Sequence, residues 1–260
     1  MIDFLAPFFA GPLRPYAERL ALASAAGAEP SGVMARGASL DAGWAAECLA
    51  RASRASDCED LRALAAAWFR DYTMAVLPGA LVAATLHRRG LTFDADAVVW
   101  CGAANGWLAM LVLPDGGEAS GATLAALLSP LVNAHLPRVV AAFSVAARVS
   151  RRLLWCTGGV AAAGIARQLA AHPVLTPAQR AEVLAWIDAP VSIDGFPNPF
   201  HGAFRPGAEP GQPGVAPVRR ICCLNYRLPG EGHCGTCPRT APTPSRTPSA
   251  GANVAIAGTP

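Results

Sequence analysis

Residues 222–237 read CCLNYRLPGEGHCGTC, and this stretch holds four of the eight cysteines in the chain. Two cysteines are adjacent, ten residues follow, and Cys-Gly-Thr-Cys completes the pattern Cys-Cys-x10-Cys-x2-Cys. Four thiolates so close together can complete a metal or cluster site without help from the rest of the protein. The candidate ligands are Cys222, Cys223, Cys234 and Cys237. We interpret the rest of the sequence outward from this motif.

Three chemistries use closely spaced cysteines: disulfides, structural zinc and iron–sulfur clusters. Disulfides need an oxidising compartment, and the start of the chain has an acid at Asp3 and no basic region typical of a secretory signal. A bond between Cys222 and Cys223 would also close a strained ring. Disulfides are therefore the least favoured of the three.

Zinc and an iron–sulfur cluster remain as alternatives. Structural zinc favours cysteines separated by roughly two to four residues, a spacing that Cys234 and Cys237 have. Cys222 and Cys223 lack it, because adjacent side chains in an extended segment point to opposite sides. A 2Fe-2S cluster has two irons that each take two thiolates, so it accepts ligands over a longer span. The spacing favours the cluster and leaves zinc open.

The residues around the cysteines resemble the C-terminal signature of the FhuF-type ferric-siderophore reductases. The resemblance rests on the cysteine spacing, the basic pair Arg219-Arg220, the Tyr-x-Leu-Pro-Gly stretch at 226–230, and Pro238. Upstream, Asn198-Pro199-Phe200 and Leu153-Leu154-Trp155 are similar to further landmarks of that family. The N-terminal half of the chain is a weaker match.

This resemblance implies a cytoplasmic enzyme that binds one 2Fe-2S cluster through the four cysteines and passes one electron to Fe(III) held by a siderophore. Hexadentate chelators hold Fe(III) far more tightly than Fe(II), so reduction releases the iron. No Gly-x-Gly-x-x-Gly fingerprint of a flavin or nicotinamide site follows an expected strand. We therefore expect an external electron donor, either a ferredoxin or a flavin reductase.

Three arginines near the cysteines, Arg219, Arg220 and Arg227, are candidate substrate contacts. Their charges would either stabilise a dianionic cluster or dock an anionic ferric chelate or an acidic donor, and the sequence leaves both roles open. His233 precedes Cys234 and would either donate a hydrogen bond to a sulfur or face solvent. No further catalytic residue is indicated.

The other four cysteines are scattered among alanines and leucines, and we expect them to be small buried hydrophobic residues; they are Cys48, Cys58, Cys101 and Cys156. Cys156 is of most interest because it follows Trp155.

Composition limits the function classes. The apolar fraction of 53% is ample for a core, and the net charge of +3 gives no indication of nucleic-acid binding. A membrane-spanning helix needs about 20 largely apolar residues. The best candidates are 124–147, interrupted by Pro130 and Pro137, and 153–171, which carries Arg167. Both are more typical of buried helices, and peripheral membrane attachment stays open.

The sequence predicts a mainly α fold with one small β-hairpin, hence α+β, and an irregular cluster segment packed on the helical body. Short apolar runs rich in branched and aromatic residues predict the hairpin at 97–113. Short helices are expected around Pro7, Pro12 and Pro15. Longer helices are expected at 40–55, 60–77, 78–89, 123–133, 137–147, 151–171 and 176–188.

We divide the chain into three regions. Residues 1–190 form a mainly helical scaffold that would bind the siderophore, and residues 191–238 form the iron–sulfur segment. Residues 239–260, rich in Thr, Pro and Ser, predict a disordered tail.

Two other functions stay open. One is a binding or regulatory protein whose cysteine segment is held together by zinc or by a cluster, without reductase activity. The other is siderophore binding without reduction of the iron, which follows from a distant similarity of the family to siderophore synthetases.

Overall fold

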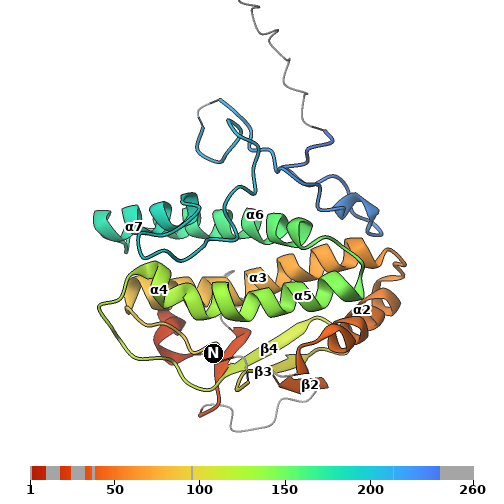
Figure 1. Cartoon of the computed structure of the whole chain (residues 1–260), viewed down its shortest axis with the longest axis horizontal. Helices are drawn as coiled ribbons and strands as arrows, with labels where there is room; N and C mark the ends of the chain where they lie inside the picture. Colours follow the sequence, from red (N-terminus) through yellow and green to blue (C-terminus); the bar gives the residue numbers. More distant parts are fainter. Residues whose placement is uncertain are drawn as a thin grey trace, which may run out of the picture.

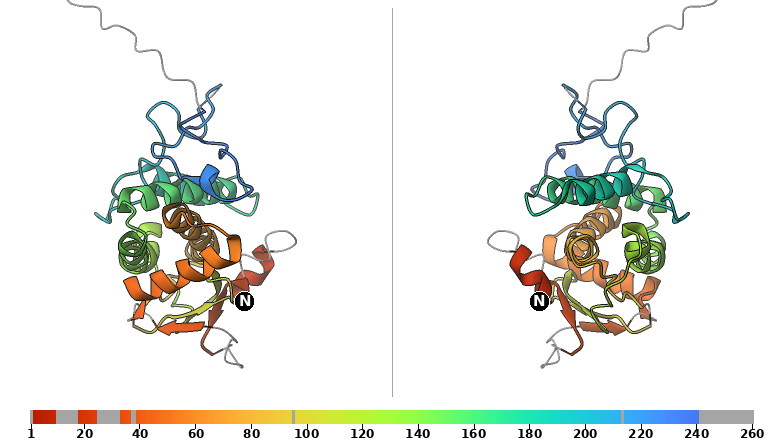
Figure 2. Two further views of the ribbon diagram at one scale, coloured as in Figure 1. Left: turned by 90° about the vertical axis from the view of Figure 1, so that its right-hand side faces the viewer. Right: turned by 90° about the vertical axis from the view of Figure 1, so that its left-hand side faces the viewer.

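The computed structural model describes residues 2–9, 18–24, 33–36, 39–94, 96–212 and 214–240. A body of helices lies at its centre, with a small sheet on one side and an irregular C-terminal segment on the other (Figure 1). Side views show the same three layers, with the C-terminal segment over α6 and α7 and away from the sheet (Figure 2). This arrangement confirms the predicted fold class.

The centre of the body is the pair α3 (Leu61–Leu86) and α6 (Arg151–Ala170), which pack against each other. α3 is buried along most of its length, as its mainly apolar sequence requires. Its first turn is capped by Asp60, whose side chain accepts hydrogen bonds from the backbone N–H groups of Arg62 and Ala63.

The sequence predicted that Pro78-Gly79 would divide this region into two helices, and that prediction was wrong, because α3 continues through Pro78. Proline removes one backbone donor, but packing against neighbouring elements can stabilise a helix that contains it. Gly79 serves close packing instead: an added Cβ would lie 2.7 Å from Leu20 Cδ1 and 3.3 Å from Leu5 Cδ1. The glycine therefore lets the N-terminal residues approach α3.

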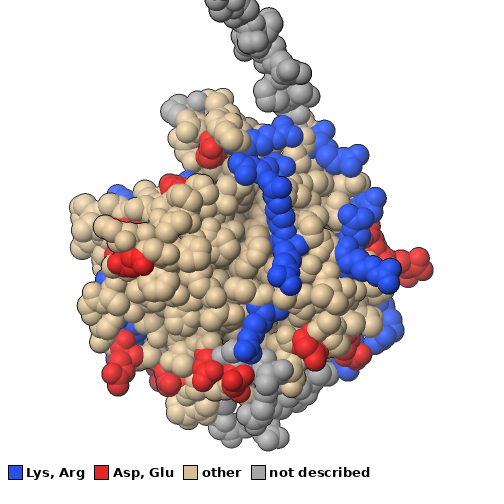
Figure 3. Space-filling view, viewed as in Figure 1, with Lys and Arg blue, Asp and Glu red and all other residues tan. Residues whose placement is uncertain are grey.

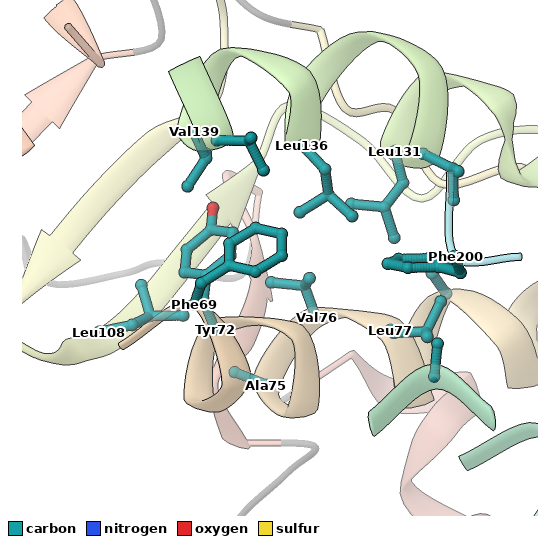
Figure 4. Packing of buried hydrophobic residues seen from close by; sticks show 14 of the residues in the cluster. Phe69, Tyr72, Ala75, Val76, Leu77, Leu108, Leu131, Leu136, Val139 and Phe200 are labelled. Atoms are coloured by element: carbon teal, nitrogen blue, oxygen red, sulfur yellow. The ribbon is translucent and has the colours of Figure 1, made fainter. Parts of the chain in front are cut away.

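A second layer of helices covers α3. It contains α2 (Ala42–Ser56), capped by Asp41, and the continuous run of α4 (Leu124–Ser129), the π-helical turn η4 (Pro130–His135) and α5 (Leu136–Ala146). Leu136 and Val139 of this run point toward Tyr72 and Val76 of α3, and Leu131 points toward Leu77 and Phe200 (Figure 4). These contacts place the second layer firmly on the core.

The run Leu124–Ala146 is the one helix in the described part of the chain with the length and composition to cross a membrane. Half of its most apolar window, 50%, is buried inside the fold. Core helices of globular proteins pass the same test of length and composition.

The helix α7 (Pro177–Asp188) lies beside α6 and confirms the expected start at Thr176-Pro177. The Thr176 side chain accepts from the backbone N–H of Gln179, and the Gln179 side chain accepts from the N–H of Thr176, which forms a capping box.

The sheet has the order β1-β4-β3-β2. Its hairpin, β3 (Val99–Gly102) and β4 (Leu108–Leu113), confirms the predicted strands. The sequence did not predict β1 (Leu20–Leu22), which pairs parallel to β4, or β2 (Val33–Arg36), which pairs antiparallel to β3. Such short edge strands carry too few residues for a clear alternating pattern.

The helix expected around Pro7 is the 3-10 helix η1 (Asp3–Phe8). The helices expected around Pro12 and Pro15, and most of the tail predicted to be disordered, lie outside the described residues. After α7 the described chain is irregular apart from the short 3-10 helix η5 (Asn225–Arg227). The division of the chain at residues 190 and 238 stays a prediction.

Candidate metal centre

The irregular C-terminal segment is fixed to the body by Asn198 and Phe200. The Asn198 side-chain amide donates to the backbone oxygens of Trp186 (2.8 Å) and Ala189 (3.1 Å) at the end of α7, and its oxygen accepts from the N–H of Phe200 (3.0 Å). Phe200 is buried against α6, where an added Cβ on Gly159 would lie 2.6 Å from the Phe200 carbonyl oxygen. The Asn-Pro-Phe landmark is therefore a structural anchor.

A second anchor lies closer to the cysteines. Two backbone bonds, from Arg220 N–H to the Ala203 oxygen and from Arg205 N–H to the Val218 oxygen, both 2.8 Å, join two stretches of the segment. The Cys156 thiol of α6 reaches the oxygens of Ala203 (3.2 Å) and Ile221 (3.7 Å). Burial raises the pKa of this thiol, although nearby backbone N–H groups and arginines oppose the shift, so Cys156 is suited to a structural role.

The expectation that the scattered cysteines are buried is confirmed for all four: Cys48, Cys58, Cys101 and Cys156. By contrast, two of the clustered cysteines, Cys222 and Cys234, are partly exposed.

The four clustered cysteines are held by two turns. Leu224 adopts a left-handed backbone conformation (φ 62°) directly after the adjacent pair and leads into η5. The second turn is closed by a bond from Cys237 N–H to the Cys234 oxygen (3.0 Å). These turns bring Cys223 Sγ to 3.5 Å from Cys234 Sγ.

Asn225 connects the two turns and is buried. Its amide nitrogen donates to Glu231 Oε2 (2.9 Å) and to the Gly232 oxygen (3.2 Å), and its oxygen accepts from Arg70 Nη1 of α3 (2.9 Å). Sequence reasoning missed both Asn225 and Arg70. A polar residue inside the cysteine motif was the one signal for Asn225, and Arg70 carried none because its partner lies 155 residues away.

Residues 219–239 match a family model, that of the FhuF 2Fe-2S C-terminal domain. The chain carries a FhuF-type 2Fe-2S domain. The matched residues include all four clustered cysteines, which confirms the resemblance read from their spacing and makes a 2Fe-2S cluster the cofactor. A search of curated proteins found no match to the chain.

The geometry of the FhuF-type domain fits this cofactor. Two thiolates at about 2.3 Å from one tetrahedral metal lie roughly 3.7 Å apart, close to the 3.5 Å between the Cys223 and Cys234 sulfurs. Within the described ranges, no three His, Cys, Asp or Glu side chains gather closely enough to hold one ion. The separation of the Cys223 and Cys234 sulfurs is that of two thiolates on one iron of such a cluster.

Arg219 places a positive charge beside the thiols of the FhuF-type domain. It is 3% exposed, and it donates from its backbone N–H to the Thr236 oxygen (3.0 Å) and from Nε to Thr236 Oγ1 (3.1 Å). Burial raises the pKa of Cys223 against the influence of Arg219. Burial also opposes ionisation of Cys234, but the Arg219 charge and the hydrogen bond from Cys223 outweigh it and lower the pKa of that thiol.

His233 also lies at a sulfur, with Nδ1 3.4 Å from Cys237 Sγ. This is the position expected of a side chain that donates a hydrogen bond to a ligand. The His233 ring packs near the Tyr226 ring, with centroids 5.1 Å apart. The Arg239 guanidinium lies over the Tyr226 ring, 4.9 Å from its centroid. These aromatic contacts hold the His233 ring beside the thiol.

The three arginines proposed as substrate contacts lie in different environments of the FhuF-type domain. Arg219 is buried, Arg220 is exposed beside a small pocket of about 110 Å³ that also contains Arg152, and Arg227 pairs with Asp60 at 2.6 Å. Arg227 therefore ties the domain to the start of α3. Figure 3 shows a column of basic side chains that descends from the C-terminal segment over the helical body. A substrate role for the three stays a prediction.

Proposed function

We propose that this protein is a ferric-siderophore reductase, which transfers one electron to Fe(III) in a siderophore complex and so releases Fe(II). The observation that carries the proposal is the FhuF-type match at residues 219–239 over four thiols that lie in two turns at the surface of the helical body. Cytoplasmic location, a ferredoxin or flavin reductase as donor, and peripheral contact with a membrane belong to the same proposal.

When bound, a 2Fe-2S cluster supplies one electron that it can accept and return reversibly. Cys222, Cys223, Cys234 and Cys237 would hold it. The partial exposure of Cys222 and Cys234 leaves that site near solvent, which suits outer-sphere transfer to a chelate too large to enter the core. Arg219 and His233 place a positive charge and a hydrogen-bond donor at the sulfurs, and both favour the more negative, reduced form.

The electron balance of the proposed reaction is simple. The Fe(III) of the chelate accepts one electron and becomes Fe(II), a bound 2Fe-2S cluster would supply that electron, and no bond to the protein forms or breaks. Because the siderophore binds Fe(II) weakly, other ligands then take the iron.

The direct test mixes the dithionite-reduced, cluster-loaded protein with ferric siderophores under anaerobic conditions. We expect reoxidation in visible absorption together with capture of Fe(II) by a ferrous chelator. A loaded and reducible protein that no ferric siderophore reoxidises would defeat the reductase proposal and favour the binding or regulatory alternative.

The ligand assignment has its own test. Serine replacement of each clustered cysteine should change the visible and EPR spectra, whereas Cys101→Ser, a buried thiol in the sheet, should leave them unchanged. If Cys222→Ser had no effect, another ligand would be needed, and the first candidates are His233, which already lies at Cys237, and Cys156.

A further inference from the structure

A cleft of about 670 Å³ opens beside the FhuF-type domain, between α3, α6 and the turn of the hairpin. Its polar lining comes from Arg19, Arg70, Asp71, Asn105, Thr157 and Arg219, and Trp107, Val160 and Ala161 add apolar surface. A volume between about 300 and 1,000 Å³ is typical of small-molecule sites. The cleft is thus large enough for a metal chelate, unlike the pocket of about 110 Å³ beside Arg220.

The charge of the cleft is positive. Arg19 is neutralised by Asp71 at 2.7 Å. Arg70 donates to the neutral side chain of Asn225, and Arg219 donates to the neutral side chain of Thr236. In the part of the chain that the structure describes, neither Arg70 nor Arg219 pairs with a carboxylate. Two guanidinium charges therefore remain available to an anionic ligand.

Two buried polar atoms in the lining have no hydrogen-bond partner among the described residues: Arg219 Nη1 and Thr157 Oγ1. Thr157 is 1% exposed and Arg219 is 3% exposed. Buried polar groups nearly always have a partner, because leaving one unpaired costs free energy. Both atoms are shielded from solvent in the structure, so acceptor oxygens of a ligand would pair with them once the Arg219 and Thr157 side chains turn toward it.

Arg219 also connects the cleft to the cluster ligands. The side chain that lines the cleft holds Thr236, which lies between Cys234 and Cys237 in the sequence. Thr236 Oγ1 in turn lies 3.9 Å from Cys234 Sγ, so Arg219 and Thr236 form a chain of contacts from the cleft to this thiol.

We propose that this cleft is the substrate site, and that it takes an anionic ferric chelate, such as a ferric tris-catecholate, in contact with Arg70 and Arg219. This inference rests on the proposed reductase function and adds the place and the charge class of its substrate. In the proposed reaction the Fe(III) in the cleft would accept one electron, which a bound 2Fe-2S cluster would supply, and the chelate would leave as its Fe(II) form with no proton or bond exchanged with the protein.

The test places one negative charge in the cleft without touching the cluster segment. Ala161 lines the cleft from α6, so Ala161→Glu adds bulk and charge there, and Ala161→Gln adds similar bulk without charge. The matched control is Gly164→Glu, because Gly164 is exposed on the same helix and an added Cβ meets nothing within 4 Å. All variants must first show full cluster content by visible absorption.

Binding is measured by calorimetry with redox-inert Ga(III) complexes, one a trianionic tris-catecholate and one a neutral trihydroxamate. We expect the wild type to bind the trianion more tightly. Ala161→Glu should weaken that binding by about fivefold or more, Ala161→Gln should weaken it less, and Gly164→Glu should leave it unchanged. The effect of the glutamate should shrink with added salt, as expected for a charge interaction near solvent.

The outcomes separate the cleft from the reductase function. If ferric chelates reoxidise the reduced wild type but Ala161→Glu binds and reacts as the wild type does, the cleft is not the substrate site and the reductase proposal stands. If Arg152→Glu removes binding while Ala161→Glu does not, docking occurs at the small pocket that Arg152 and Arg220 line. If no ferric chelate reoxidises the loaded wild type, the reductase proposal itself fails.

Discussion

At the scale of single residues, the polar side chains that organise the cluster segment matter as much as the cysteines. Arg219 is the clearest case, because its buried charge lies beside the thiols and has no carboxylate partner among the described residues. A positive charge stabilises the reduced form of a cluster more than the oxidised form, since reduction adds a negative charge.

We predict that Arg219→Gln lowers the reduction potential of the cluster by tens of millivolts, on the order expected for one partly screened charge. Redox titration followed by EPR measures the shift. The matched control is Arg227→Gln, which removes the same charge from an exposed side chain paired with Asp60 and should change the potential less. Equal shifts in the two variants would show that Arg219 has no special coupling to the cluster.

Asn225 supports a second residue-scale prediction. Asn225→Ala removes hydrogen bonds to Glu231, Gly232 and Arg70, and leaves the Arg70 guanidinium without its acceptor. We expect a loss of about 1–3 kcal/mol in the free energy of unfolding and faster release of the cluster on heating. Asn133→Ala, which removes a single 3.3 Å bond to Ser129 on the helical body, is the control and should retain the cluster as the wild type does.

At the scale of elements, α6 shows how a helix can be shaped to receive an irregular segment. An added Cβ on Gly159 would lie 2.6 Å from the Phe200 oxygen and 2.8 Å from Ala203 Cβ. Gly164 lies on the same helix, and an added Cβ there meets nothing within 4 Å. The first glycine is therefore required for close approach, whereas the second is not.

Alanine replacements at these two glycines should have opposite effects. Gly159→Ala should destabilise the protein by about 1–3 kcal/mol, because the anchor of the C-terminal segment must shift. Gly164→Ala should stabilise it by about 0.5–1 kcal/mol through helix propensity. Chemical denaturation measures both. A stabilisation of the same size at both positions would mean that helix propensity and not close packing governs this helix.

The helices and the hairpin could be predicted from local patterns, because caps such as Asp41, Asp60 and Thr176 and apolar periodicity lie within a few residues of one another. The cysteine motif was likewise local. What could not be predicted depends on distant contacts: Pro78 continues a helix supported by its neighbours, and β1 pairs with a strand about ninety residues away. The cleft that we propose as the substrate site joins Arg19, Trp107 and Arg219, and no sequence pattern connects them.

At the scale of the whole molecule, the helical body separates the sheet from the FhuF-type domain, and its centre holds a buried titratable pair. His135 is 0% exposed, and its Nε2 lies 2.6 Å from the Tyr72 hydroxyl. Its Nδ1 has no partner among the described residues. Burial lowers the pKa of His135 to about 4, and the Arg138 charge adds to the effect.

This histidine predicts that global stability falls in mild acid. Between pH of about 6.5 and 4 the unfolded chain binds a proton at His135 that the folded protein excludes, so the free energy of unfolding decreases as the pH falls through that window. The loss attributable to this group should reach up to about 3 kcal/mol near pH 4 and be absent above pH of about 7.

Urea denaturation of the wild type and of His135→Gln across this range isolates the contribution of His135, because acid effects on the cluster are common to both proteins. The variant is expected to be less stable at neutral pH but to lose less stability on acidification, whereas His172→Gln, an exposed control, should follow the wild-type curve. Parallel curves for the wild type and His135→Gln would show that the core histidine does not set the acid limit, and would leave the carboxylates, such as Asp60 with its lowered pKa, to account for it.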